Sequence, residues 1–192
     1  MRVLVACEFS GVVRDAFRKR GHDSWSCDIL DSNSKYHIKD DVVKHLDEGW
    51  DLLIAHPPCT YISNAGARHL YPNKILNEDR YVLGLEARKL FMVLYNANIN
   101  KICVENPTPS KIFELPKHSQ VIQPYQFGHP YSKRTLLWLR NLPELKPTNV
   151  VDVVESTKVA GNWFNKGGKD RQKNRSVTFA GIAEAMAEQW GC

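Results

Sequence analysis

Short apolar runs alternate with amphipathic stretches along most of the chain. Residues 2–7 form an apolar run of strand length, and from Val12 the apolar side chains recur at helical spacing until Gly21, a residue typical of helix ends. Further strand-length runs follow, at 24–29, 50–55 and 101–105, and a candidate short strand lies at 39–42. From Arg80 to about residue 98 the apolar positions again follow a helical period. This alternation predicts a parallel sheet covered by helices.

The remaining pattern predicts an antiparallel edge and a final helix. Residues 120–128 and 135–139 are strand-like, and the short connection between them favours a hairpin. A loop-rich region at 141–175 precedes a helical pattern at 179–190. The predicted fold class is therefore α/β, a doubly wound and mostly parallel sheet with a C-terminal antiparallel hairpin. We expect residues 1–192 to form a single domain.

Composition adds few constraints to this pattern. With 192 residues, of which 43% are hydrophobic and 24% charged, the chain suits one compact globular domain. No stretch is long and apolar enough to span a membrane, and the N-terminal residues lack the apolar core and cleavage site of a signal peptide. We therefore expect a cytoplasmic protein with no membrane partner.

Charge and cysteine usage narrow the possible partners. The net charge of +5 is compatible with a polyanionic partner such as nucleic acid. The five cysteines form no CxxC pair, so the sequence predicts neither a disulfide framework nor a zinc site, and we expect no metal. These cysteines are Cys7, Cys27, Cys59, Cys103 and Cys192.

Candidate ligand-binding residues follow the predicted strands, because the carboxyl ends of parallel strands face one crevice. Gly11 follows the first strand, where its backbone can approach a ligand closely. Asp28 lies at the end of the second strand, where a carboxylate can accept hydrogen bonds from ribose hydroxyls. Together they indicate a nucleoside-containing cofactor. The indication is weak by itself, because residues 9–13 lack the repeated glycines of a dinucleotide fingerprint.

Two motifs further along the chain suit pyrimidine chemistry. Cys59 ends the turn His-Pro-Pro-Cys after one predicted strand, and Glu105 begins Glu-Asn-Pro at the end of the next. Attack on C6 of a cytosine needs a thiolate, and the charge that enters the ring is relieved at N3 by a proton or a hydrogen bond. Cys59 and Glu105 can supply these two functions, although a lone cysteine is more commonly an inert buried residue.

Several motifs, taken in order, resemble those of the cytosine-C5 DNA methyltransferases, which belong to the Rossmann-like class I enzymes that use S-adenosyl-L-methionine (SAM). They are Phe9-Ser-Gly11, Pro57-Pro-Cys59, Glu105-Asn-Pro107 and Phe127-Gly-His-Pro130 with Lys133-Arg134. The resemblance covers residues 2 to about 140 and implies methylation of C5 of cytosine in DNA. It implies that Cys59 is the covalent nucleophile and that Glu105 holds the cytosine edge. It also implies that Lys133 or Arg134 lies beside the base.

The same resemblance implies a SAM site at the ends of the early strands. The residues that would surround its methionine part are Phe9, Ser10 and Gly11, with Glu8 and Pro57 as further contacts. Asp28 would bind the ribose and Ile29 would pack against the adenine. Asp41, or equally Asp40, would lie near the adenine amino group.

Around the first motif the chain departs from the family pattern. The family usually has an acid two residues before the phenylalanine, where this chain has Cys7, and Glu8 is the candidate substitute. Further glycines usually follow the first, and Val12 and Val13 stand in those places.

The largest departure is the short region after the late strand. Family members carry a substantial target-recognition region there, whereas only residues 141–175 are available here. We therefore expect low sequence specificity, or recognition supplied by a separate subunit or by a homodimer. The candidate DNA-contacting residues of this region are Lys166, Lys169, Arg171, Lys173 and Arg175, with Trp163 and Phe164 nearby to stack on a base. A solvated loop is an equally good interpretation of these charges.

Other functions remain open on the sequence alone. An exocyclic-amino methyltransferase also has two prolines after its fourth strand, but it needs Asp or Asn before them and an aromatic residue after, where this chain has His56 and Cys59. The same pyrimidine chemistry could act on RNA or a free nucleotide. A non-catalytic SAM-binding or nucleic-acid-binding relative is the alternative from a different class; Cys59 and Glu105 argue against it, and the missing glycines argue for it.

Overall fold

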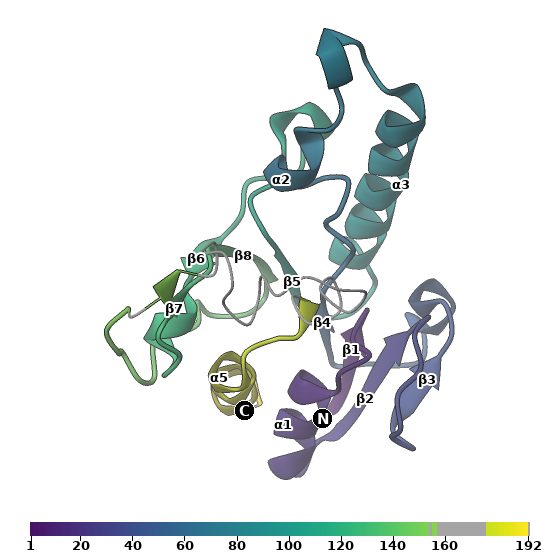
Figure 1. The fold of residues 1–192 in the computed structure, drawn as a ribbon. Coiled ribbons are helices and arrows are strands. Elements are labelled where there is room, and N and C mark those ends of the chain that lie inside the picture. Colours follow the sequence, from purple (N-terminus) through teal and green to yellow (C-terminus); the bar gives the residue numbers. More distant parts are fainter. Residues whose placement is uncertain (154, 157–175, 192) are drawn as a thin grey trace.

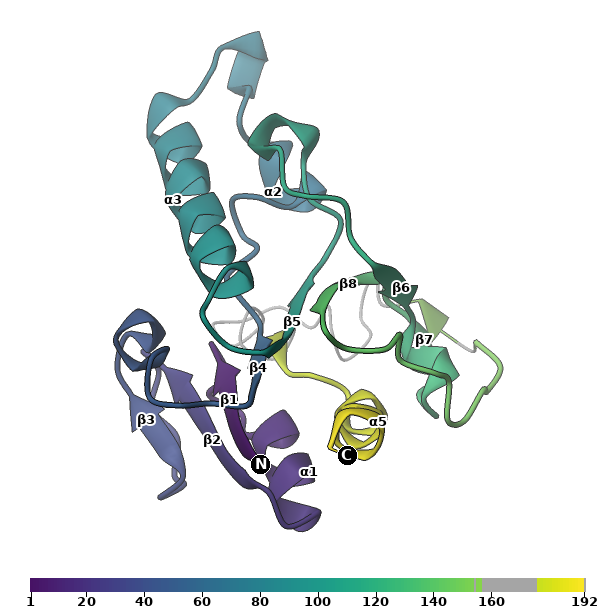
Figure 2. The same cartoon turned by 180° about the vertical axis from the view of Figure 1, so that it is seen from behind.

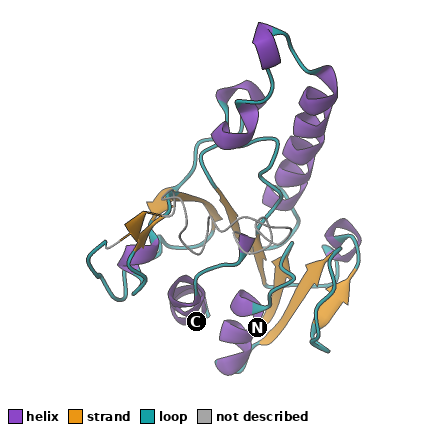
Figure 3. Cartoon of the chain, viewed as in Figure 1, coloured by secondary structure: helices purple, strands orange, loops and turns teal. Residues whose placement is uncertain are grey.

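A computed structural model of the chain describes residues 1–153, 155–156 and 176–191. Its main feature is a seven-stranded sheet in the order β3-β2-β1-β4-β5-β8-β6, seen in Figures 1 and 3. The strands of this sheet are β1 (Arg2–Ala6), β2 (Asp23–Asp28), β3 (His37–Lys39), β4 (Leu52–Ala55), β5 (Lys101–Asn106), β6 (Gln120–Ile122) and β8 (Thr135–Arg140). A separate small sheet pairs β7 (Tyr131–Ser132) with β9 (Glu155–Ser156).

Helices cover both faces of the sheet. The α-helices are α1 (Val12–Lys19), α2 (Asn64–Ala67), α3 (Glu78–Tyr95) and α5 (Ala180–Trp190). The short 3-10 helices are η1 (Val42–His45), η2 (Pro72–Lys74), η3 (Lys111–Phe113) and η4 (Pro124–Gln126). In both views, α1 and α5 lie side by side on one face and α3 covers the other, with α2 beyond the carboxyl end of the sheet (Figures 1 and 2).

The strand order contains a reversal at β1. The chain adds β2 and β3 on one side of β1 and then returns to add β4 and β5 on the other, all of them parallel. β8 is antiparallel to both of its neighbours, β5 and β6. The expected α/β fold, mostly parallel and with an antiparallel hairpin, is confirmed. In sheets of this kind ligands bind beyond the carboxyl ends of the strands at the reversal, here β1 and β4.

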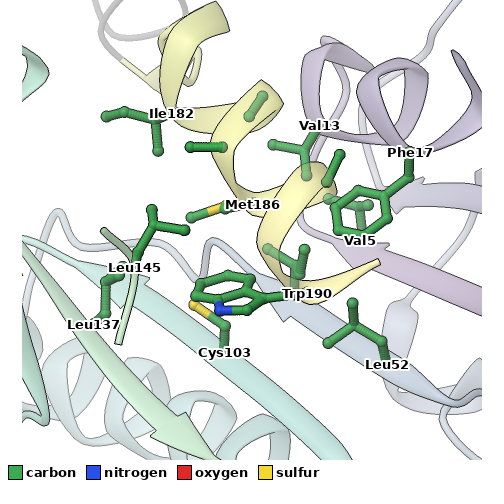
Figure 4. Close-up of a cluster of buried hydrophobic side chains, with 14 of the residues drawn as sticks. Val5, Val13, Phe17, Leu52, Cys103, Leu137, Leu145, Ile182, Met186 and Trp190 are labelled. Atoms are coloured by element: carbon green, nitrogen blue, oxygen red, sulfur yellow. The ribbon is translucent and has the colours of Figure 1, made fainter. Parts of the chain in front are cut away.

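On the face covered by α1 and α5, the core consists of side chains from the central strands and from α5. Val5 of β1 and Leu52 of β4 pack against Met186 and Trp190 of α5 (Figure 4). The indole Nε1 of Trp190 donates to the carbonyl of Pro143 at 3.0 Å, so the buried polar atom of this large side chain is satisfied. The last helix therefore completes the core of the first strand.

On the opposite face, α3 packs through a small set of large side chains. Phe91 is fully buried and meets Trp138 of β8 edge-on, with 5.0 Å between the ring centroids. Leu94, one turn further, is also fully buried. Near its first turns, α3 instead exposes apolar side chains such as Val82. The C-terminal half of α3 therefore attaches this helix to the sheet.

Two predicted strands differ from the structure in their extent. The third strand lies at His37–Lys39, and the residues after it form η1 because the Asp41 side chain accepts from the Val43 amide at 3.1 Å, which begins a helical turn. The run 120–128 is extended only to Ile122, since Pro124 lacks an amide hydrogen and begins η4. Helix α2 and the 3-10 helices were not predicted.

Membrane-spanning helices, disulfides and metal-binding clusters were searched for among the described residues alone. No helix among them is long and apolar enough to cross a membrane. The cysteines of the described residues form no disulfide with one another, and Cys27 and Cys103 are buried. No group of His, Cys, Asp or Glu side chains in residues 1–153 and 176–191 is arranged to hold a metal ion.

We expect Phe91→Ala to lower the free energy of unfolding by about 3–5 kcal/mol, because it removes a buried ring and leaves a cavity beside Trp138. Val82→Ala is the matched control on the same helix: Val82 is 52% exposed, so its effect should be within about 0.5 kcal/mol. Urea unfolding followed by tryptophan fluorescence measures both. Equal losses would contradict the assigned packing of α3.

Candidate active site

The turns after β4 and β5 lie next to each other because these strands are direct neighbours. In their parallel pairing Ala55 lies opposite Val104, so the residues that follow, His56 and Glu105, continue the same register. The amide of His56 donates to the carbonyl of Ala6 at 3.0 Å, which extends the pairing of β4 with β1 by one step. His56 Nδ1 lies 3.1 Å from Oε2 of Glu105. The two predicted motifs therefore meet through their first residues.

A second contact joins the same two motifs. Asn106 is buried, and its Nδ2 donates to the carbonyl of Pro57 at 2.8 Å. Pro57 and Pro58 have restricted backbone angles and no amide hydrogen, so the carbonyl is the group through which this turn can be held. The turn that leads to Cys59 is thus fixed from the neighbouring strand.

The segment that follows Cys59 is folded back on itself. The amide of Ser63 donates to the carbonyl of Cys59 at 3.0 Å, and the Ser63 hydroxyl accepts from the Gly66 amide at 3.2 Å at the start of α2. A Cβ at Gly66 would collide with the carbonyl of Thr60, so only glycine fits there. This packing turns residues 59–66 into a compact loop.

Arg80 of α3 attaches this loop to the helix. Its guanidinium donates from Nη2 to the carbonyls of Gly66 at 3.1 Å and Thr60 at 3.4 Å. It also lies over the ring of Tyr61, 5.0 Å from the centroid. Arg80 was not predicted from the sequence, where its position on the helix is the only signal.

The loops after the two motifs are also paired through their backbones. The amide of Asn64 donates to the carbonyl of Thr108 at 3.0 Å, and the amide of Ser110 donates to the carbonyl of Ile62 at 2.8 Å. Ser63 and Pro109 form an isolated β-bridge between these bonds. The loop of Cys59 therefore rests on the segment that directly follows Glu105-Asn-Pro.

Several charges set the ionisation of Glu105. Burial raises its pKa, but the hydrogen bond and the electrostatic interaction with His56, followed by that with Lys133, outweigh burial and hold the pKa below its usual value. The Glu105 side chain keeps 22% of its surface exposed, whereas that of His56 keeps 8%. The carboxylate is therefore charged near neutral pH and still accessible.

The two predicted basic residues lie in different surroundings. Lys133 is half-buried between β7 and β8, acts electrostatically on Glu105, and has its Nζ 5.8 Å from the centroid of the Phe179 ring. Arg134 is exposed. Of the pair, Lys133 is therefore the residue whose charge acts on the pKa of Glu105.

At the end of β1, Glu8 acts as a cap for α1. It is 4% exposed, and its two carboxylate oxygens accept from the amides of Val13 at 2.7 Å and Arg14 at 3.2 Å. Burial raises its pKa, opposed by the charge of His56 and by these two hydrogen bonds. Glu8 was predicted as a SAM contact, and its capping role was not predicted.

The first-motif residues are packed around this cap. Gly11 has φ of 74°, and a Cβ there would collide with the guanidinium of Arg14. Ser10 donates from Oγ to Oε1 of Glu8 at 3.4 Å, and Phe9 is half-buried. The close approach at Gly11 is thus made by a side chain of the protein itself.

Carboxylates and an apolar side chain gather at the ends of β2 and β3. Asp28 accepts from the Leu30 amide at 2.9 Å through Oδ1, and Ile29 beside it is 75% exposed. After burial, Asp28 and Asp41 contribute to raising the pKa of Cys7 to about 12, so these carboxylates lie near the end of β1. This arrangement fits a nucleoside. The carboxylates can accept hydrogen bonds from its ribose hydroxyls, and the exposed apolar side chain can pack against its base.

Asp40 and Asp41, both candidates for the adenine amino group, differ in their partners. Asp40 binds Lys44 at 2.7 Å and His45 at 3.3 Å, and the hydrogen bond from Lys44 is the main cause that lowers its pKa to about 2. Asp41 is exposed and accepts from the amide of Val43. Asp41 is therefore the better placed acceptor for a ligand.

Two features lie away from these residues. A cavity of about 670 Å³ follows α1 and α5, with Val12, Phe127 and Gly181 in its lining and none of the predicted catalytic residues. The predicted DNA-contacting residues Lys166, Lys169, Arg171, Lys173 and Arg175, with Trp163 and Phe164, fall outside the described residues.

No known family model matches the chain, and no curated protein sequence matches it. Among solved structures, the chain is similar to an E. coli prophage protein described as a DNA modification methyltransferase, with 12% identity and a TM-score of 0.46 over 79% of this chain and 52% of that one. It is also similar to the methyltransferase EhMeth of Entamoeba histolytica, with 14% identity and a TM-score of 0.48 over 79% and 57%. The chain thus spans little more than half of each.

We expect Arg80→Ala to loosen the loop after Cys59, because its guanidinium holds two carbonyls of that loop. Amide hydrogen exchange at Gly66 and Ala67 should accelerate by about tenfold or more, as for the loss of charged hydrogen bonds. Arg68→Ala, which changes an exposed arginine whose Nε donates to the neighbouring His69 at 3.0 Å, should leave this exchange unchanged. Unaltered exchange in Arg80→Ala would refute the attachment.

Proposed function

We propose that the protein transfers a methyl group from SAM to C5 of cytosine in DNA through a covalent adduct with Cys59. The contact that supports this proposal most directly is the joining of the two motifs, His56 to Glu105 at 3.1 Å and Asn106 to Pro57 at 2.8 Å. Because of these contacts, a thiol and a carboxylate from adjacent strands serve one site. A nucleophile and a hydrogen-bonding group for the same ring are what C5 chemistry requires.

The proposed steps follow from these residues. The target cytosine leaves the base stack, and Sγ of Cys59 forms a bond to C6 while the C5=C6 electron pair moves into the ring. Glu105 holds the edge of the ring that includes N3, where the charge accumulates, and Lys133 adds a positive charge beside it. When C5 carries its new methyl group and has lost its proton, the double bond reforms and Cys59 leaves as a thiolate.

The residues that would hold SAM lie at the ends of β1, β2 and β3. Asp28 would accept from the ribose hydroxyls, Ile29 would carry the adenine, and Asp41 would accept from its amino group. SAM supplies the electrophilic methyl group. Phe9, Ser10, Gly11 and Pro57 stay proposed contacts with its methionine part, and Glu8 would act by holding α1 in place.

DNA is the proposed substrate because of the net positive charge and the motif resemblance. The sequence-specific part of recognition would come from residues 141–175 or from a partner chain. Duplex DNA, single-stranded RNA and dCMP are therefore the substrates to compare.

Tritiated methyl-SAM should label duplex DNA in the presence of the wild-type protein, and Cys59→Ala should reduce the labelling by about a thousandfold or more, because no other residue replaces a covalent nucleophile. Duplex DNA with 5-fluorocytosine should trap a covalent complex with the wild type only, since fluorine cannot leave C5 as a proton does. Cys192→Ala is the control for loss of a thiol. Equal incorporation by Cys59→Ala would rule out the covalent mechanism, and labelling of RNA or dCMP alone would change the substrate.

Isothermal calorimetry should detect SAM binding by the wild type, and Asp28→Ala should weaken this binding about tenfold or more through the loss of hydrogen bonds to a charged group. The matched control is Asp31→Ala, which removes an exposed carboxylate that pairs with Lys39 at 3.1 Å. Equal weakening in both variants would place the ribose elsewhere. A wild type that does not bind SAM would favour a module without this cofactor.

A further inference from the structure

The side chain of His56 has no role in the proposed steps of methyl transfer. His56 follows β4 directly, its main chain is fixed by the bond to Ala6, and the stiff Pro57 comes next. The side chain is 8% exposed. The imidazole is therefore held in one place by the sheet and by the turn that leads to Cys59.

The imidazole contacts one acid directly and acts electrostatically on a second acid from another strand. Nδ1 contacts Oε2 of Glu105 on β5 at 3.1 Å. Glu8, at the end of β1, is close enough for the charge of His56 to affect its pKa. Both carboxylate oxygens of Glu8 accept from α1, so Glu105 is the acid whose free oxygen can face a ligand.

The other ring nitrogen of His56 makes no hydrogen bond to the described residues. Nε2 of His56 is buried and has no hydrogen-bond partner in the described part of the chain. A buried polar atom without a partner destabilises a protein, and a leucine or a methionine would fill the same volume without this cost. The residue type at this position therefore needs a reason other than packing.

Resting on the proposed function, we infer that His56 is a positioning residue that holds the Glu105 carboxyl group in the orientation needed to bind cytosine. The bond from Nδ1 engages Oε2 and leaves Oε1 for the edge of the base. Without it, the Glu105 side chain could rotate between staggered positions. A misplaced carboxyl group would relieve the ring charge poorly when Cys59 attacks.

The addition step can be measured without SAM. Cys59 adds to C6, a solvent proton bonds to C5, the original C5 hydrogen leaves to water, and the C6–S bond breaks to restore the base. Duplex DNA carrying tritium at C5 of cytosine therefore releases tritium to water in proportion to this step. Cys59→Ala should release none.

The variants at position 56 separate orientation from packing. His56→Ala should lower the maximal rate of tritium release about a hundredfold, with less than a threefold change in the DNA concentration for half-maximal rate. His56→Asn places an amide nitrogen where Nδ1 was and should recover at least about tenfold of the loss. His118→Ala, in which the lost imidazole packs against Trp138, is the control and should match the wild type.

Each result has a distinct meaning. The positioning role is overturned if His56→Ala releases tritium at the wild-type rate. It is also overturned if His56→Asn shows no recovery while its unfolding midpoint in urea equals that of the wild type. His56→Gln is the further variant if His56→Asn has a lower unfolding midpoint in urea than the wild type. It keeps an amide on a longer side chain and should release tritium as slowly as His56→Ala. Equal recovery in His56→Gln and His56→Asn would show a packing role instead. If the wild type itself releases no tritium and transfers no methyl group, the proposed function fails and this inference fails with it.

Discussion

The parallel pairing of β4 with β5 is the constraint on which the rest of the site depends. Leu52 to Ala55 are buried on both faces of the sheet, so the register of β4 is set by packing and cannot slip by one residue without exposing apolar side chains. That register places Ala55 opposite Val104, so the residues that follow them, His56 and Glu105, are also neighbours. The distance between His56 and Glu105 is thus a consequence of core formation.

Around this pairing the structure adds contacts that reduce the conformational freedom of the loop formed by residues 59–66. Asn106 holds Pro57, Arg80 holds Thr60 and Gly66, and the loop of Cys59 rests on residues 107–110. Each contact joins segments far apart in the sequence. A site of this kind is preorganised, because the entropy of ordering the loop is lost during folding and not during substrate binding.

The parts of the molecule with a local signal could be predicted from the sequence. Apolar runs identify β1, β4 and β5, and their ends identify Cys59 and Glu105 as candidates, because a buried strand and a following turn are properties of neighbouring residues. The third strand was placed two or three residues too late, since Asp41 caps a helical turn that the apolar pattern does not show. The capping role of Glu8 was not predicted, because its bonds to α1 depend on backbone geometry. Long-range partners, such as His56 with Glu105 or Arg80 with the loop, leave no periodic trace in the sequence.

The packing of α5 against β1 has a consequence for the order of events during synthesis. Trp190 and Met186 fill the face of β1 and β4, and Trp190 also binds the carbonyl of Pro143. A nascent chain that has already emerged as far as β5 still lacks this helix, so one apolar face of its central strands stays open to water. The native core can then form only after residues 180–190 have left the ribosome, and until then the growing chain exposes an apolar surface that favours aggregation.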